Sequence, residues 1–132
     1  MITRNYGKEN LGNGQGSSLD QFNNPVDVHV AADGTQYVLD KDNNRVLKFA
    51  PGAAQGEVVA GGNGAGSSLN QLDGAYGFAV DAAGFIYVAD TGNHRVVKWA
   101  PGASQGVVVG GQGGQGSSAN QLSSPMDVAI DE

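Results

Sequence analysis

Residues 12–22 read GNGQGSSLDQF, and this stretch returns as GNGAGSSLNQL at 62–72 and as QGGQGSSANQL at 112–122. The offset is fifty residues each time, with no insertion or deletion. A long fixed period indicates that one supersecondary unit has been copied, and each copy must bury its apolar surface against the next. The repeat therefore decides the fold class before any single residue is considered.

The composition is typical of a β-rich globular chain. Its 132 residues include 22 glycines and are 39% hydrophobic, which favours many tight turns between short strands. The formal charge is −6, with only seven Lys and Arg. Because phosphate backbones and anionic lipid surfaces are bound through clustered cations, this balance counts against nucleic acid and membrane as partners.

The chain has no cysteine, which excludes disulfides, thiolate metal sites and a cysteine nucleophile but is compatible with either side of a membrane. The N-terminal segment MITRNYGKEN has charges and no apolar core, so it is not a secretory signal. No apolar run is long enough to span a bilayer. The sequence does not assign a compartment; an extracellular location is the expectation that we carry forward.

Four strands are predicted in each period, as the second copy illustrates. Residues 76–80 alternate large and small side chains, and two β-branched or aromatic runs at 85–90 and 95–100 flank the hairpin TGNH. A Pro-Gly pair ends the third strand, and a valine run at 107–109 forms a short fourth strand. Gly84 is expected to take a positive φ in the first turn.

The connection between periods is too polar and glycine-rich for a strand, and its length suits a crossing from the outer edge of one sheet to the inner edge of the next. No segment keeps a 3.6-residue period over three turns, which excludes helical repeats. Four antiparallel strands per unit favour a β-propeller blade. On the innermost strand, Gly77 and Ala79 form a small face against which a neighbouring blade can pack closely.

The segment IYVADTGNHRVVKW at 86–99 resembles the signature of the NHL-repeat family, whose Asn-His-Leu triplet stands where this chain has Asn93-His94-Arg95. The segment AYGFAVD at 75–81 is similar to the strand that precedes that signature, and QYVLDKDNNRVLKF at 36–49 is a degenerate copy. The resemblance implies a six-bladed propeller. Similar blades occur in protein-binding scaffolds, RNA-binding regulators, amidating lyases and lactonase-like enzymes.

The predicted organisation is an N-terminal segment at 1–11 that fills a possible outer-strand position, blades at 12–61 and 62–111, and a linker with one further inner strand at 112–132. This all-β chain thus holds about two and a half blades, which cannot close a ring alone. Either it is a section of a longer propeller, or several chains assemble into one ring; three chains of two blades would give six. The first alternative explains the leftover inner strand more simply.

One polar set recurs in both copies: Asp40, Asn43 and Arg45 return as Asp90, Asn93 and Arg95. A ligand or metal cluster is one interpretation. The favoured one is structural, with Asp and Arg paired across the hairpin and Asn in the left-handed turn position, because repeated residues serve what every blade needs.

Departures from the repeat are better candidates for a site. Asp27 and Asp127 stand where the second copy has Gly77, and His29 replaces an alanine, all on innermost strands that border a central channel. In lyase-like and lactonase-like relatives such carboxylates and histidines hold a divalent cation, so the resemblance implies calcium or zinc here. The alternative is that both Asp side chains cap local amides and that His29 is satisfied between blades. His94 is expected at the surface of its turn.

Nucleophilic catalysis has little support, because the serines repeat inside glycine loops and no Gly-x-Ser-x-Gly elbow is present. The tyrosines at 37 and 87 are expected in the blade core. The predicted function is therefore a non-enzymatic propeller scaffold that binds a protein or a small molecule. It is completed as a homo-oligomer or by further blades of the same chain. The rival hypothesis is a metal-dependent propeller enzyme, lyase-like or lactonase-like, that uses Asp27, His29 and Asp127.

Overall fold

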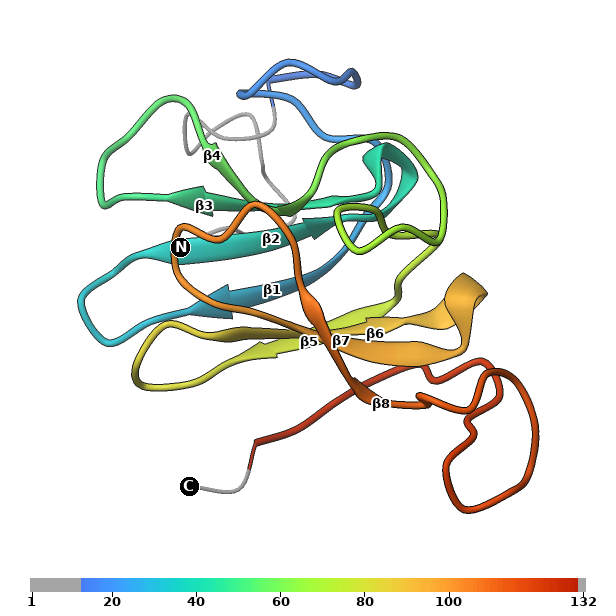
Figure 1. Ribbon diagram of the computed structural model, residues 1–132. Coiled ribbons are helices and arrows are strands. Elements are labelled where there is room, and N and C mark those ends of the chain that lie inside the picture. The colour runs from blue at the N-terminus through green and yellow to red at the C-terminus, as the bar shows by residue number, and fades with distance from the viewer. Residues whose placement is uncertain (1–12, 131–132) are drawn as a thin grey trace.

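The computed structural model describes residues 13–130, which form two four-stranded antiparallel sheets (Figure 1). Each sheet is a meander in which sequence neighbours are hydrogen-bonded neighbours, in the orders β1-β2-β3-β4 and β5-β6-β7-β8. The all-β prediction is confirmed, and so are the four strands per period. The outer strand expected within residues 1–11 lies outside the described residues.

Strand bounds recur at the fifty-residue offset. The first sheet contains β1 (Pro25–Val30), β2 (Gln36–Asp40), β3 (Arg45–Phe49) and β4 (Glu57–Gly61). The second contains β5 (Gly77–Val80), β6 (Ile86–Asp90), β7 (Arg95–Trp99) and β8 (Val107–Gly110).

The turn between the first two strands of each sheet has the predicted chemistry. Gly84 takes a φ of 88°, as expected, and Gly34 takes 92° in the first sheet. A carboxylate closes each turn: Asp33 Oδ1 accepts from the Thr35 amide at 2.9 Å, and Asp81 Oδ1 accepts from the Ala83 amide at 3.0 Å and from the Phe85 amide at 2.9 Å. Such Asx turns position the two strands for pairing.

The second hairpin of each sheet differs from the prediction. A 3-10 turn, η2 (Lys41–Asn43) or η3 (Thr91–Asn93), is followed by a left-handed residue, which is Asn44 (φ 52°) or His94 (φ 55°). The expectation that Asn43 and Asn93 occupy the left-handed position was therefore wrong by one residue. Asn43 and Asn93 instead end the 3-10 turns, and their side-chain amides donate to the carboxylates of Asp40 and Asp90.

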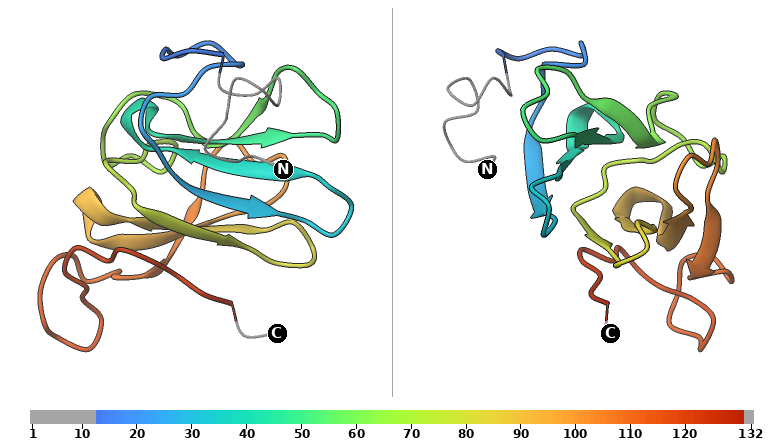
Figure 2. Two further views of the ribbon diagram at one scale, coloured as in Figure 1. Left: turned by 180° about the vertical axis from the view of Figure 1, so that it is seen from behind. Right: turned by 90° about the vertical axis from the view of Figure 1, so that its left-hand side faces the viewer.

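The main hydrophobic core lies between the two sheets, which stack as seen from two directions in Figures 1 and 2. The first sheet contributes Tyr37, Leu39 and Val46, and the second contributes a larger set of side chains: Phe78, Ile86, Val88, Val97 and Trp99. A smaller cluster of Phe22, Val38, Leu47 and Phe49 covers the other face of the first sheet. Burying side chains of this size contributes about 1.5–3 kcal/mol each.

The glycine-rich loops between units have a defined conformation. A parallel bridge joins Ala65 to Leu72 in the loop between the sheets, and the same bridge recurs in the other two copies. The Gln71 side chain folds back on the loop, and a Cβ built on Gly66 would lie only 2.2 Å from its Oε1 atom. A side chain at this position would displace Gln71 from the loop, where Gln71 Oε1 accepts from the Ser68 amide and Gln71 Nε2 donates to Asn63 O.

In the third copy, the inner strand predicted within residues 112–132 does not form. Residues 125–130 have no ladder partner, because none of the other described strands lies beside them as β2 lies beside β1. The segment nevertheless passes below β5 on the side away from the first sheet (Figure 1). A Cβ at Gly77 would lie 2.6 Å from both Met126 O and Asp127 Oδ1, so the close approach expected at this glycine is present.

No helix among residues 13–130 has the length and apolar character needed to cross a membrane.

Candidate functional site between the two sheets

The repeated polar set forms a buried network at the end of each sheet. Arg45 Nε donates to Asp40 Oδ2 at 2.8 Å, the Asp40 side chain being fully buried. Asn43 Nδ2 donates to the same oxygen at 2.8 Å, and Asp40 Oδ1 accepts from the Asn23 amide at 2.6 Å. Asp90, Asn93 and Arg95 repeat this arrangement with the same Arg–Asp distance of 2.8 Å.

The remaining guanidinium donors clamp the preceding loop. In the first sheet, Arg45 donates from Nη1 to Ser17 O and from Nη2 to Ser18 O and Gln21 O, at 2.9–3.1 Å. Arg95 makes the same three bonds to Ser67, Ser68 and Gln71. Each network thus uses its donors within its own blade, which supports a structural role for these residues.

Asp27 links the inner strands of the two sheets. Its Oδ1 accepts from the Val28 amide at 2.9 Å, and its Oδ2 accepts from the Phe78 amide of the neighbouring sheet at 3.3 Å. Partial burial raises the pKa of this carboxyl above its ordinary value, against the lowering effect of the two amides; the nearby charge of Asp127 raises it further. The carboxylate therefore caps backbone amides, as in the second of the two interpretations from sequence.

The other two candidates have local partners. Asp127 Oδ1 accepts from the Val128 amide at 2.9 Å. The His29 ring packs edge-on against Tyr37 in its own sheet, with 5.9 Å between the ring centroids. Within residues 13–130, no three His, Cys, Asp or Glu side chains are grouped so that they could hold a metal ion. The calcium or zinc site at Asp27, His29 and Asp127 gains no support from this geometry.

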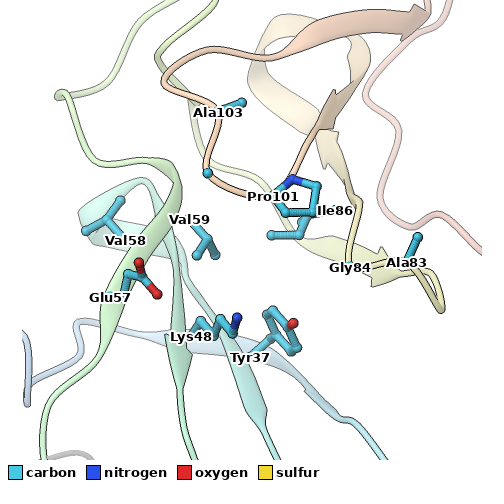
Figure 3. Close-up of a pocket in the computed structure, with 11 residues that line it drawn as sticks. Tyr37, Lys48, Glu57, Val58, Val59, Ala83, Gly84, Ile86, Pro101 and Ala103 are labelled. Atoms are coloured by element: carbon cyan, nitrogen blue, oxygen red, sulfur yellow. The ribbon is translucent and has the colours of Figure 1, made fainter.

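A groove with two adjoining cavities runs between the sheets, and His29 borders the larger of them. The smaller cavity, of about 310 Å³, is lined by Tyr37, Lys48, Glu57, Val58, Val59, Ala83, Gly84, Ile86, Pro101, Gly102 and Ala103 (Figure 3). The larger cavity, of about 620 Å³, shares Tyr37 and Lys48 and adds the carboxylates Asp33 and Asp81.

Two polar groups in this groove have no partner within residues 13–130. The Tyr37 ring is largely buried, and its hydroxyl oxygen, which remains accessible, makes no hydrogen bond there. Lys48 forms no ion pair there either. In the second sheet the equivalent Lys98 is held 4.7 Å above the Phe85 ring, whereas the first sheet has Thr35 at that ring position.

The sequence reasoning missed this groove. It assigned Tyr37 to the core, where the ring does lie, but it did not predict that Tyr37 also lines a cavity between the sheets. The signal was available in the departures from the repeat, because Thr35 replaces Phe85 and Glu57 replaces Val107 at the fifty-residue offset. Those substitutions, together with His29, border one groove, which only the pairing of two sheets creates.

Comparison with protein families identifies the repeat. Residues 72–99 match the family model described as the NHL repeat, a stretch that runs from the end of the loop between the sheets to the last residue of β7. A search of curated proteins finds no match. The resemblance noted from the sequence is confirmed: the chain carries an NHL repeat at residues 72–99. Its two four-stranded antiparallel sheets are blades of the β-propeller type.

Proposed function

We propose that this chain is an NHL-type propeller scaffold that binds a protein or a small molecule and has no catalysis of its own. Its ring is completed by self-assembly or by further blades of a longer chain. The observation that carries this proposal is the apolar surface on the outer faces of the two blades, where Val28 and Val30 are 41% and 44% exposed, and Val107 and Val109 are 64% and 43% exposed.

The repeat indicates what these surfaces do. Val28 occupies the position of Phe78, which is 5% exposed because it packs in the core between the blades. The outer side of the first blade is thus the counterpart of the surface that the second blade buries. Unpartnered apolar faces of this kind mark association sites in repeat architectures.

Lack of catalysis is proposed because the recurring polar residues are engaged within their own blades, and because Asp27 and Asp127 cap backbone amides. Charge supports the choice of partner: with −6 overall, nucleic acid and anionic membranes are unfavourable.

Sedimentation equilibrium of the wild type and of the double variant Val28→Asp with Val30→Asp tests the proposal. We expect the wild type to associate and the double variant to be monomeric, because buried unpaired carboxylates oppose the contact. Ser104→Asp with Gln105→Asp, on an exposed turn, is the control and should behave as the wild type. A ring of one defined mass supports self-assembly, and polydisperse association supports completion by further blades. A monodisperse wild-type monomer would contradict both.

A further inference from the structure

The smaller cavity of the groove has one cationic and one anionic side chain on the same wall. Lys48 of β3 and Glu57 of β4 are directly paired in the strand register, and both line the cavity. Among residues 13–130 their charged atoms do not approach within ion-pair distance of each other or of another charged group. The two charges are therefore available to a third molecule.

Tyr37 adds a hydrogen-bonding group to that wall. Its ring is largely buried, whereas its hydroxyl oxygen remains accessible at the cavity and makes no hydrogen bond within the described part of the chain. Figure 3 shows the Tyr37 oxygen and the Lys48 nitrogen directed toward the space between the sheets. A group that accepts hydrogen bonds from both would lie at this point.

The opposite wall is apolar and comes from the second blade. Ile86 and Pro101 face the cavity from that side, and Val59 extends the apolar surface on the first blade (Figure 3). A cavity of about 310 Å³ is at the lower end of the range for small-molecule sites. Its occupant is therefore a compact molecule with an apolar body.

Charge selects among such molecules. A simple anion would be attracted by Lys48 but repelled by Glu57, and a simple cation would meet the reverse. A zwitterion satisfies both, since it carries a negative group for Lys48 and a positive group for Glu57.

We propose that this smaller cavity, called the cleft from here on, binds an α-amino acid with an aliphatic side chain. Its carboxylate accepts hydrogen bonds from Lys48 and the Tyr37 hydroxyl, its ammonium group pairs with Glu57, and its side chain packs on Val59, Ile86 and Pro101. The inference deepens the ligand-binding part of the proposed function, but it does not require ring completion, because one chain supplies both walls of the cleft.

Chemical-shift titration of the full chain with L-leucine tests the ligand class. We expect saturable shifts at residues lining the cleft. Leucinamide, which lacks the carboxylate, and N-acetyl-leucine, which lacks the ammonium group, should each bind at least about tenfold more weakly, since each loses a charge-assisted hydrogen bond. Equal binding of all three compounds, or no saturable shift with leucine, would overturn the proposal.

Variants test the residues. Lys48→Gln and Glu57→Gln should each weaken leucine binding about tenfold or more, and Tyr37→Phe should weaken it several-fold. The matched controls are Lys98→Gln and Tyr87→Phe, which make the same chemical changes at the repeat-equivalent positions and should leave binding unchanged. An equal effect of the control variants would reject this cleft as the site.

Thermal unfolding of every variant establishes that it folds, and sedimentation separates the two proposals. Loss of leucine binding in Lys48→Gln with an unchanged assembly mass isolates the cleft from blade association. Wild-type protein that associates but shows no leucine binding contradicts the cleft and leaves the scaffold proposal standing. Leucine binding by a wild-type protein that stays monomeric supports the cleft and contradicts the scaffold proposal.

Discussion

At the residue scale, the clearest lesson comes from Asp27. Asp27 was a candidate metal ligand because it stands where the second copy has Gly77. In the structure, its two carboxylate oxygens accept hydrogen bonds from the Val28 amide of its own strand and from the Phe78 amide of the next blade. The position is filled alternately along the chain by Asp, Gly and Asp at 27, 77 and 127. Gly77 has no room for a Cβ beside Asp127, so the second blade keeps glycine where the others have a carboxylate.

The raised pKa of Asp27 makes a prediction about pH. Because the folded-state pKa is above the ordinary value of 3.8, the folded protein holds this proton more tightly than the unfolded chain. The protonated Asp27 therefore stabilises the folded state at pH values below 3.8, and this stabilisation is lost as pH rises through the folded-state pKa. The free energy of unfolding of Asp27→Asn, relative to that of the wild type, should therefore increase as pH rises from below 3.8 to neutrality, because only the wild type loses this stabilisation.

Carboxyl-carbon NMR titration checks the same carboxyl directly. Asp127→Asn should lower the pKa of Asp27 toward its ordinary value, because the charge of Asp127 is one of the causes of the rise. An Asp27 pKa at or below 3.8 in the wild type would contradict the assignment.

At the element scale, a buried arginine joins each sheet to the loop that precedes it. The loop 13–24 has few apolar side chains of its own, and its Ser17, Ser18 and Gln21 carbonyls are held by Arg45. A planar guanidinium with five donors can bond a carboxylate and three carbonyls at once, whereas the ammonium group of lysine presents its donors from a single nitrogen.

Arg45→Ala should destabilise the protein by about 3–5 kcal/mol, because it leaves the fully buried Asp40 without its ion-pair partner. Urea unfolding measures this loss. Hydrogen exchange provides an internal control: amides of the loop 13–24 should lose protection, while the loop 63–74, held by Arg95, should keep it. Equal loss of protection in the two loops would show that the clamp is not local.

At the scale of the whole molecule, one core cluster contains side chains of both sheets, so neither blade buries its apolar face alone. The two blades should therefore unfold together. Trp99, which lies in this cluster and is the only tryptophan, reports the second blade, and far-UV circular dichroism reports both.

The two signals should give the same urea midpoint. Phe78→Ala should lower the free energy of unfolding by about 3–5 kcal/mol. It should also reduce hydrogen-exchange protection in β2 and β3 of the first blade, although the substitution is in the second. Separate transitions for the two signals, or a protection loss confined to the second blade, would contradict a shared core.

The sequence by itself determined the repeat, the four strands of each complete unit and the first turn of each sheet, because periodicity, β-branched runs and glycine placement act over a few residues. It also indicated the Asp40–Arg45 pairing, since both residues recur at the same hairpin. Only the tertiary structure decided that residues 125–130 form no strand, since a strand requires a partner across the sheet. It alone also brought Tyr37, Lys48 and Glu57 together with Ile86 and Pro101. A cleft between two blades depends on how the sheets stack. No local sequence pattern encodes which side chains remain without partners after the sheets have stacked.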